Sequence, residues 1–325
     1  MRGEEEMILS VSRRTDIPRY FGQWFRNRIR EGYLLVRNPV NPRQISQIDL
    51  SPSVVDCMVF WTKNPAGLIP YLDELEKYPY YFQFTLTGYG HDVEPDLPDK
   101  RSVLIPLFQQ LSKRIGRGRM VWRYDPIFIN SRYTWEYHKK AFREIASRLG
   151  EYTDQVVISF VDFYRKNRRN MAELGVSSPD GDGMRKMAAD LAGIAREFGL
   201  GIVSCAEELD LEKEGVSHGS CIDRRRIEKI LGCRLQGSAD PGQRTACGCM
   251  ESVEVGAYDT CPGGCRYCYA SENQQKVKKN LQNYDVNSPL LCGKVGPDDM
   301  VTARKMRSLK EMQMNFDCIL SVKKI

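Results

Sequence analysis

The stretch CPGGCRYCYA, from Cys261 to Ala270, carries three cysteines on a loop loosened by a proline and two glycines. Its thiols are spaced four and then three residues apart, so they can converge on one [4Fe-4S] cube. Because such a cube normally takes four thiolates, a set of three leaves one iron open to a small molecule. The alternative is a structural zinc knuckle, since cysteine-rich loops also bind zinc through four ligands.

Composition and length are those of an ordinary globular protein. The chain has 325 residues, 42% hydrophobic and 28% charged, which is enough for one barrel of about 200 to 250 residues and an appended module. The net charge of +6 is scattered, so it permits a polyanionic partner such as nucleic acid without demanding one. No long apolar stretch or signal peptide is present, and we expect a cytoplasmic protein that has no membrane partner.

Short apolar runs alternate with amphipathic segments, the pattern of repeated βα units around a parallel sheet. We expect strands at 7–12, 54–62, 80–87, 120–124, 155–161 and 201–206. We expect helices at 19–31, 65–76, 101–115, 134–149, 184–198, 223–231 and 302–314. The predicted fold is an α/β, (β/α)6-type partial TIM barrel over residues 1–231. Residues 232–325 form a cysteine-rich extension and tail packed over its mouth.

Polar residues follow the ends of the predicted strands, where the βα loops of a parallel barrel build active sites. They include Lys63, Thr85, Thr87, Arg123, Asp125, Ser159 and Glu207. Solvated loop positions and helix caps are the alternative for any one of them. Capping explains serine, threonine and aspartate, but it does not explain Lys63, Arg123 and Glu207 near a common mouth. Together these residues fit a polar pocket for a charged ligand.

Ten of the eleven cysteines follow residue 200, and in a reducing compartment this points to metal or redox chemistry rather than to disulfides. A second group consists of Cys205, Cys221, Cys247 and Cys249. These four can hold a second [4Fe-4S] cluster or a zinc ion, and the C-x-C spacing favours the cluster because tetrahedral zinc usually takes C-x-x-C. Cys57 and Cys318 read as isolated buried thiols, while Cys233 and Cys292 are undecided.

The CxxxCxxC spacing, with Tyr267 before the last cysteine, resembles the cluster motif of radical S-adenosylmethionine (SAM) enzymes. Three blocks at the predicted strand ends resemble those of the spore-photoproduct-lyase-like branch of radical SAM barrels. They are Thr62-Lys63-Asn64-Pro65, Phe84-Thr85-Leu86-Thr87 and Arg123-Tyr124-Asp125-Pro126. The whole chain, from Ser12-Arg13-Arg14-Thr15-Asp16 to Cys268-Tyr269-Ala270, resembles the uncharacterised DUF1848 family. Radical SAM enzymes generally carry the triplet near the start of the barrel, so here the loop must fold back over the mouth.

The resemblance implies that the open iron binds SAM and that the cluster supplies one electron to cleave it, giving a 5′-deoxyadenosyl radical that attacks substrate. We therefore expect an enzyme of unknown substrate, served by an electron donor such as ferredoxin or flavodoxin. Expected catalytic residues are Lys63, Arg123, Asp125 and Glu207, and expected SAM contacts are Tyr267, Thr85, Thr87 and Ser159. The alternatives are a non-catalytic protein that binds zinc or a redox-sensing cluster, and a DNA repair enzyme like the photoproduct lyases, which rests on fold analogy.

Overall fold

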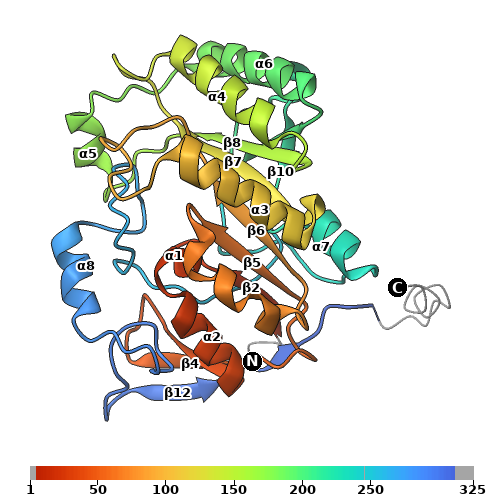
Figure 1. Cartoon of the computed structure of the whole chain (residues 1–325). Helices are drawn as coiled ribbons and strands as arrows, with labels where there is room; N and C mark the ends of the chain where they lie inside the picture. The colour runs from red at the N-terminus through yellow and green to blue at the C-terminus, as the bar shows by residue number, and fades with distance from the viewer. Residues whose placement is uncertain (1–4, 245, 312–325) are drawn as a thin grey trace.

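The structure, a computed structural model, describes residues 5–244 and 246–311. Its centre is an eight-stranded sheet in the order β10-β9-β8-β7-β6-β5-β2-β11, with every neighbouring pair parallel (Figure 1). The strands are β2 (Ile8–Val11), β5 (Cys57–Thr62), β6 (Tyr80–Thr85), β7 (Met120–Ile127), β8 (Gln155–Phe160), β9 (Gly201–Cys205), β10 (Ser217–Gly219) and β11 (Val253–Glu254).

All six expected strands lie side by side in this sheet in chain order, which confirms an α/β fold on a parallel sheet. The strands that end the sheet, β10 and β11, do not pair with each other among the described residues, so the sheet is open and no closed barrel is formed. Neither of these two short strands was predicted. Each spans only two or three residues, too few for a periodic pattern.

The strands are buried on both faces, as expected where helices cover a parallel sheet. In β5 and β6 ten of the twelve side chains are buried, and Phe60 stacks on Phe82 of the neighbouring strand at a centroid distance of 4.9 Å. The largest cluster of buried apolar side chains combines these strands with the inner faces of the helices. This core holds the carboxyl ends of the strands at one edge.

The helices of the described residues are α1 (Ile17–Tyr20), α2 (Gly22–Glu31), α3 (Ile105–Ile115), α4 (Trp135–Leu149), α5 (Arg168–Glu173), α6 (Gly181–Glu197), α7 (Arg224–Leu231) and α8 (Gln274–Leu281). Short η segments lie at η1 (Pro65–Gly67), η2 (Ile69–Leu75), η3 (Lys100–Leu104), η4 (Arg117–Arg119) and η5 (Glu212–Glu214). The helix expected at 65–76 is replaced by the 3-10 helices η1 and η2, because Pro70 lacks the N–H that an α-helix would use. Among the described residues no helix is both long and apolar enough to cross a membrane.

The C-terminal segment joins two sheets. It contributes β11 to the central sheet, and β12 (Met300–Ala303) pairs with β4 (Gln44–Asp49), whose other neighbour is β3 (Tyr33–Arg37). Short strands β1 (Glu5–Glu6) and β13 (Met306–Arg307) also pair. The helix expected at 302–314 is therefore wrong over the described residues up to 311, since pairing with β4 overrides local helix propensity. The expected domain boundary between residues 231 and 232 stays a prediction.

Candidate functional site

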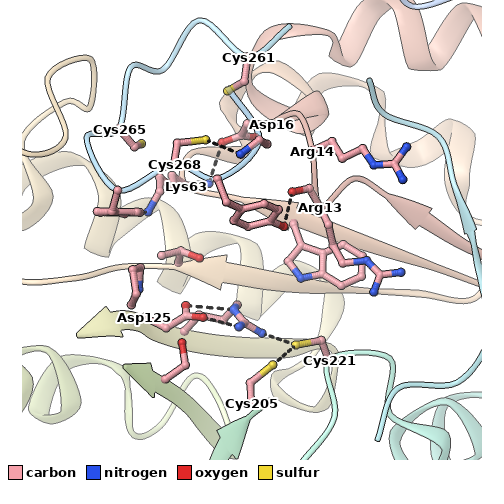
Figure 2. A pocket seen from close by; sticks show the side chains of 18 of the residues that line it. Arg13, Arg14, Asp16, Lys63, Asp125, Cys205, Cys221, Cys261, Cys265 and Cys268 are labelled. Atoms are coloured by element: carbon pink, nitrogen blue, oxygen red, sulfur yellow. Dashed lines mark hydrogen bonds and ion pairs between the residues drawn. The ribbon is translucent and has the colours of Figure 1, made fainter. Parts of the chain in front are cut away.

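A cavity of about 390 Å³ lies at the carboxyl ends of the central strands, within the size range of small-molecule and cofactor sites. Six of the predicted pocket residues line it: Lys63, Thr85, Arg123, Asp125, Ser159 and Tyr267. All seven predicted ligand cysteines line it as well: Cys205, Cys221, Cys247, Cys249, Cys261, Cys265 and Cys268. Figure 2 shows the loop cysteines on one side of this cavity and Cys205 with Cys221 on the other.

A buried ion pair on β7 forms part of the cavity lining opposite the cysteine loop. The Arg123 guanidinium donates from Nε to Asp125 at 3.1 Å, and from Nη1 to Gln83 Oε1 at 3.2 Å and to Cys221 Sγ at 2.8 Å. Burial opposes the charge of Arg123, but Asp125 and the neighbouring thiols raise its pKa well above the usual value. The guanidinium is therefore a fixed positive charge between a carboxylate and a thiol.

The second cysteine group forms a continuous set of contacts beside β9. Cys205 and Cys221 have their sulfurs 2.8 Å apart, and the Cys249 sulfur accepts from the backbone N–H of Cys221 at 3.2 Å. Hydrogen bonds from the Cys205 and Cys249 thiols, together with Arg123, hold the pKa of Cys221 well below its usual value although burial opposes this. A hydrogen bond from Cys249 lowers the pKa of Cys247 to about 7. Donating these hydrogen bonds, together with burial, raises the pKa of Cys205 and of Cys249. Thiolate, the form that binds metal, is therefore favoured at Cys221 and Cys247.

The loop from 255 to 270 carries the cysteine triplet to the cavity. It leaves β11, whose Glu254 accepts hydrogen bonds from Ser10 Oγ at 2.7 Å and from the Arg13 N–H at 3.1 Å. The loop then closes on itself through Asp259 N–H and the Ala270 carbonyl at 3.0 Å. Burial raises the pKa of Cys261 to about 12 and raises that of Cys265 as well. These thiols would release protons on binding metal.

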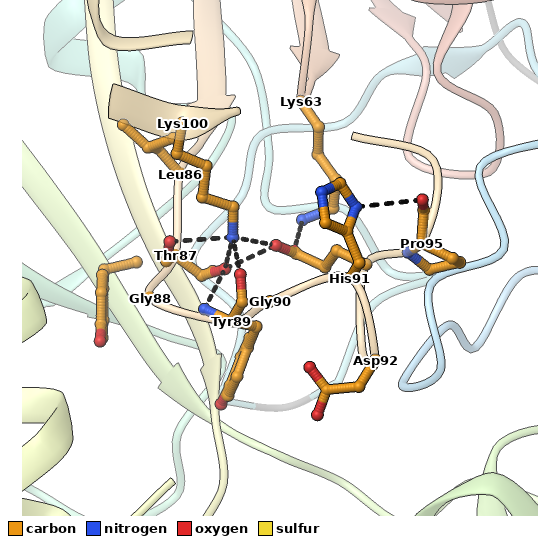
Figure 3. A network of polar contacts seen from close by, with 12 residues as sticks. Lys63, Leu86, Thr87, Gly88, Tyr89, Gly90, His91, Asp92, Pro95 and Lys100 are labelled. Carbon is orange, nitrogen blue, oxygen red and sulfur yellow. Dashed lines mark hydrogen bonds and ion pairs between the residues drawn. The ribbon is translucent and has the colours of Figure 1, made fainter. Parts of the chain in front are cut away.

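A buried carboxylate, Glu94, connects this loop to the strand ends. Its oxygens accept from Lys63 Nζ at 2.8 Å and from Thr87 Oγ1 at 2.9 Å, and it also contacts Lys100 Nζ and the Tyr267 hydroxyl. Figure 3 shows Lys63, Thr87 and Lys100 gathered in this network. Burial alone would raise the pKa of Glu94, but the two ammonium groups outweigh it and hold that pKa well below its usual range. Sequence reasoning missed Glu94 as a site residue, although it lies in the loop after a predicted strand.

Two predicted pocket residues do not line the cavity. The Glu207 carboxylate turns back to cap the end of β8 by accepting the Phe160 N–H at 2.7 Å, and burial raises the pKa of Glu207 to about 7. Thr87 is fully buried and its hydroxyl is used by Glu94 and Lys100. Both residues follow strands as expected, but the loops behind them turn their side chains into the protein. The placement gives no support to a catalytic Glu207 or a SAM-contacting Thr87.

Among the cysteines outside the two groups, the expectation of an isolated buried thiol is confirmed for Cys57. Cys57 is fully buried in the sheet, and Cys233 and Cys292 are half-buried away from the cavity lining. Cys318 lies outside the described residues. Sequence reasoning also missed several aromatic lining residues, among them Trp61 and Tyr164, for which neither spacing nor composition gave a signal.

The two cysteine groups can be compared with what a [4Fe-4S] cluster and a zinc ion require of their ligands. Within residues 5–244 and 246–311, no three His, Cys, Asp or Glu side chains already surround one point in the manner of a bound ion. A cube does not need such convergence, because each thiolate binds a different iron. Three thiols on one loop that faces a cavity therefore fit a [4Fe-4S] cluster. The second group has the right donors for a cluster or for zinc.

Comparisons with known proteins give a family but no chemistry. Residues 8–270 match the family model described as Domain of unknown function (DUF1848), a span that includes both cysteine groups. No curated protein matches the chain. A crystal structure provisionally described as an alpha-L-fucosidase from Bacteroides thetaiotaomicron shares 14% identity over 55% of this chain and 71% of that one, with a TM-score of 0.25. That similarity is too low to support any argument about fold or function.

Proposed function

The chain belongs to the DUF1848 family, and on that premise we propose that it is an iron–sulfur enzyme whose loop cysteines hold a cluster that binds SAM and cleaves it reductively. One observation carries the proposal: Cys261, Cys265 and Cys268 line the same cavity as the polar groups at the strand ends. When bound, a [4Fe-4S] cluster would supply the single electron for SAM cleavage. The substrate would occupy the same cavity.

The protein's own residues would bind and shield the ligands. The Arg14 guanidinium lies over the ring of Tyr258 at 4.5 Å, and among the described residues it has no carboxylate partner, so it is available to an anionic ligand group. Trp61 and Tyr269 add aromatic walls to the cavity, which would reduce access of water. Excluding competing reactions in this way is a main task of a protein that hosts radical chemistry.

The second cysteine group suits either metal group that the sequence left open, a second [4Fe-4S] cluster or a zinc ion. Four thiols with Arg123 beside them fit a second cluster or a zinc ion. The competing function is therefore that of a non-catalytic protein, which uses both cysteine groups only to bind metal. That competing function is favoured by the same contacts and needs no SAM. An electron donor of the ferredoxin or flavodoxin type and a DNA substrate stay predictions.

Metal and sulfide analysis after anaerobic purification tests the proposal. Wild-type protein should hold about four irons in the loop cluster and roughly eight if the second group also holds a cube. Replacing Cys261, Cys265 and Cys268 by Ala should remove about four irons and abolish dithionite-dependent formation of 5′-deoxyadenosine from SAM. Cys292→Ala, outside the cavity lining, is the matched control and should keep both properties.

Cys247→Ala with Cys249→Ala separates the two metal groups. If the second group holds zinc, this pair of substitutions should remove zinc and leave the iron of the loop cluster unchanged. Zinc without iron or sulfide in wild-type protein would contradict the enzyme proposal and favour the metal-binding alternative. Unchanged iron in the triple variant would show that the loop cysteines are not the ligands.

A further inference from the structure

Glu94 gathers four hydrogen-bond donors from separate parts of the chain. Lys63 follows β5, Thr87 follows β6, Lys100 opens η3, and Tyr267 belongs to the cysteine loop. Only 1% of the Glu94 side chain is exposed. Figure 3 shows the ends of the Lys63 and Lys100 side chains converging. A buried carboxylate with two charged and two neutral donors is held in one geometry, because losing a donor leaves part of its buried hydrogen-bonding capacity unmet.

The contacts of Glu94 and its neighbour reach the part of the motif that separates two cysteines. Tyr267 donates its hydroxyl hydrogen to Glu94. The preceding residue, Arg266, donates its backbone N–H to the Val93 carbonyl at 2.9 Å. Residues 93–94 therefore hold residues 266–267, which lie between Cys265 and Cys268.

From this arrangement we propose that Glu94 is a positioning residue, which fixes Tyr267 and thereby sets Cys265 and Cys268 over the strand ends. The inference rests on the proposed function, because it gives the positioned loop the task of holding a cluster. Tyr267 is then an anchor through its hydroxyl rather than a free aromatic surface for SAM. Lys63 acts in the same anchor, since its ammonium contacts both Glu94 and the Tyr267 hydroxyl.

Hydrogen–deuterium exchange of the loop tests positioning without requiring a metal. In Glu94→Gln and in Tyr267→Phe, backbone amides of residues 259–270 should exchange about tenfold faster or more than in wild type, because each change removes a buried charged hydrogen bond. Tyr267→Phe removes the hydrogen bond that holds the loop but keeps the Glu94 charge, so it separates the effect of the hydrogen bond from the effect of the charge. It also provides the test if Glu94→Gln fails to fold. Amides of β8 should be unchanged. Glu144→Gln, which breaks the exposed pair with Arg101, is the matched control and should leave the loop unchanged.

A second readout links positioning to the cluster. Glu94→Gln should lower iron per chain and alter the change that SAM causes in the EPR spectrum of the reduced cluster, whereas Glu144→Gln should change neither. Unchanged loop exchange in both variants would overturn the inference. Equal acceleration of the loop and β8 would also overturn it, because that result means general destabilisation. If wild type binds no iron, the proposed function fails, and the exchange data still show whether Glu94 holds the loop.

Discussion

Replacing Arg123 by Met should destabilise the protein far more than breaking a surface ion pair. The Arg123 and Asp125 side chains are only 8% and 12% exposed, so the substitution leaves a nearly buried carboxylate without its cation. It also removes the donors to Gln83 and Cys221. Breaking a buried pair from one side costs about 3 to 5 kcal/mol. Arg101→Met, which breaks a pair whose members are 71% and 33% exposed, should cost far less, because water screens an exposed pair.

Urea unfolding at pH 7, followed by tryptophan fluorescence in anaerobic buffer, measures both costs. Adding Asp125→Asn to Arg123→Met should recover about 1 kcal/mol or more, because the unpaired buried charge is then gone. This recovery separates the electrostatic cost from the loss of packing around the long side chain. A cost for Arg123→Met no larger than that for Arg101→Met would refute the reasoning. So would a double variant less stable than Arg123→Met alone.

Two other changes probe the scaffold. Burial lowers the pKa of His138 to about 4, so between about pH 6.5 and 4 the unfolded chain binds a proton that the folded chain excludes. Wild type should therefore lose up to about 3 kcal/mol of stability relative to the non-titrating His138→Gln as pH falls through that window, and a constant difference in urea unfolding would contradict this. Gly22→Ala should lower stability by about 1 to 3 kcal/mol, because its Cβ would lie 2.1 Å from the Gly67 carbonyl oxygen. Gly193→Ala on α6 meets nothing within 4 Å, and equal thermal shifts for the two would refute the clash.

The central strands were predictable because each is a nearly unbroken apolar run, and such runs have few stable alternatives to a covered parallel sheet. β6 shows this, with all but its last residue buried. The failures came where distant partners decide the structure. β12 pairs along its whole length with β4, more than 200 residues earlier in the chain, and nothing local to 300–303 indicates that pairing.

The site was predictable at the level of strand ends and less so for individual side chains. Parallel strands bring their carboxyl ends to one edge, so Lys63, Arg123 and Asp125 had to lie near one another. The sequence did not indicate in which direction each side chain points. Glu207 and Thr87 occupy the expected loops, but their side chains turn away from the cavity. Glu94 was missed for a related reason: its role depends on four partners that no spacing brings together.

The late position of the cysteine motif is explained by the strand that precedes it. β11 adds to the sheet beside β2 and runs parallel to it, so the loop after β11 leaves the sheet at the same edge as the loop after β2. Contacts continue beyond the strands: Glu254 accepts from the Arg13 N–H, and the Thr15 hydroxyl contacts Thr260, the residue before Cys261. A two-residue strand therefore brings a motif from the last quarter of the chain to the place that a first βα loop would occupy. What places the cysteine loop at the carboxyl ends of the strands is the neighbour of its strand in the sheet, and position along the sequence matters only through that pairing.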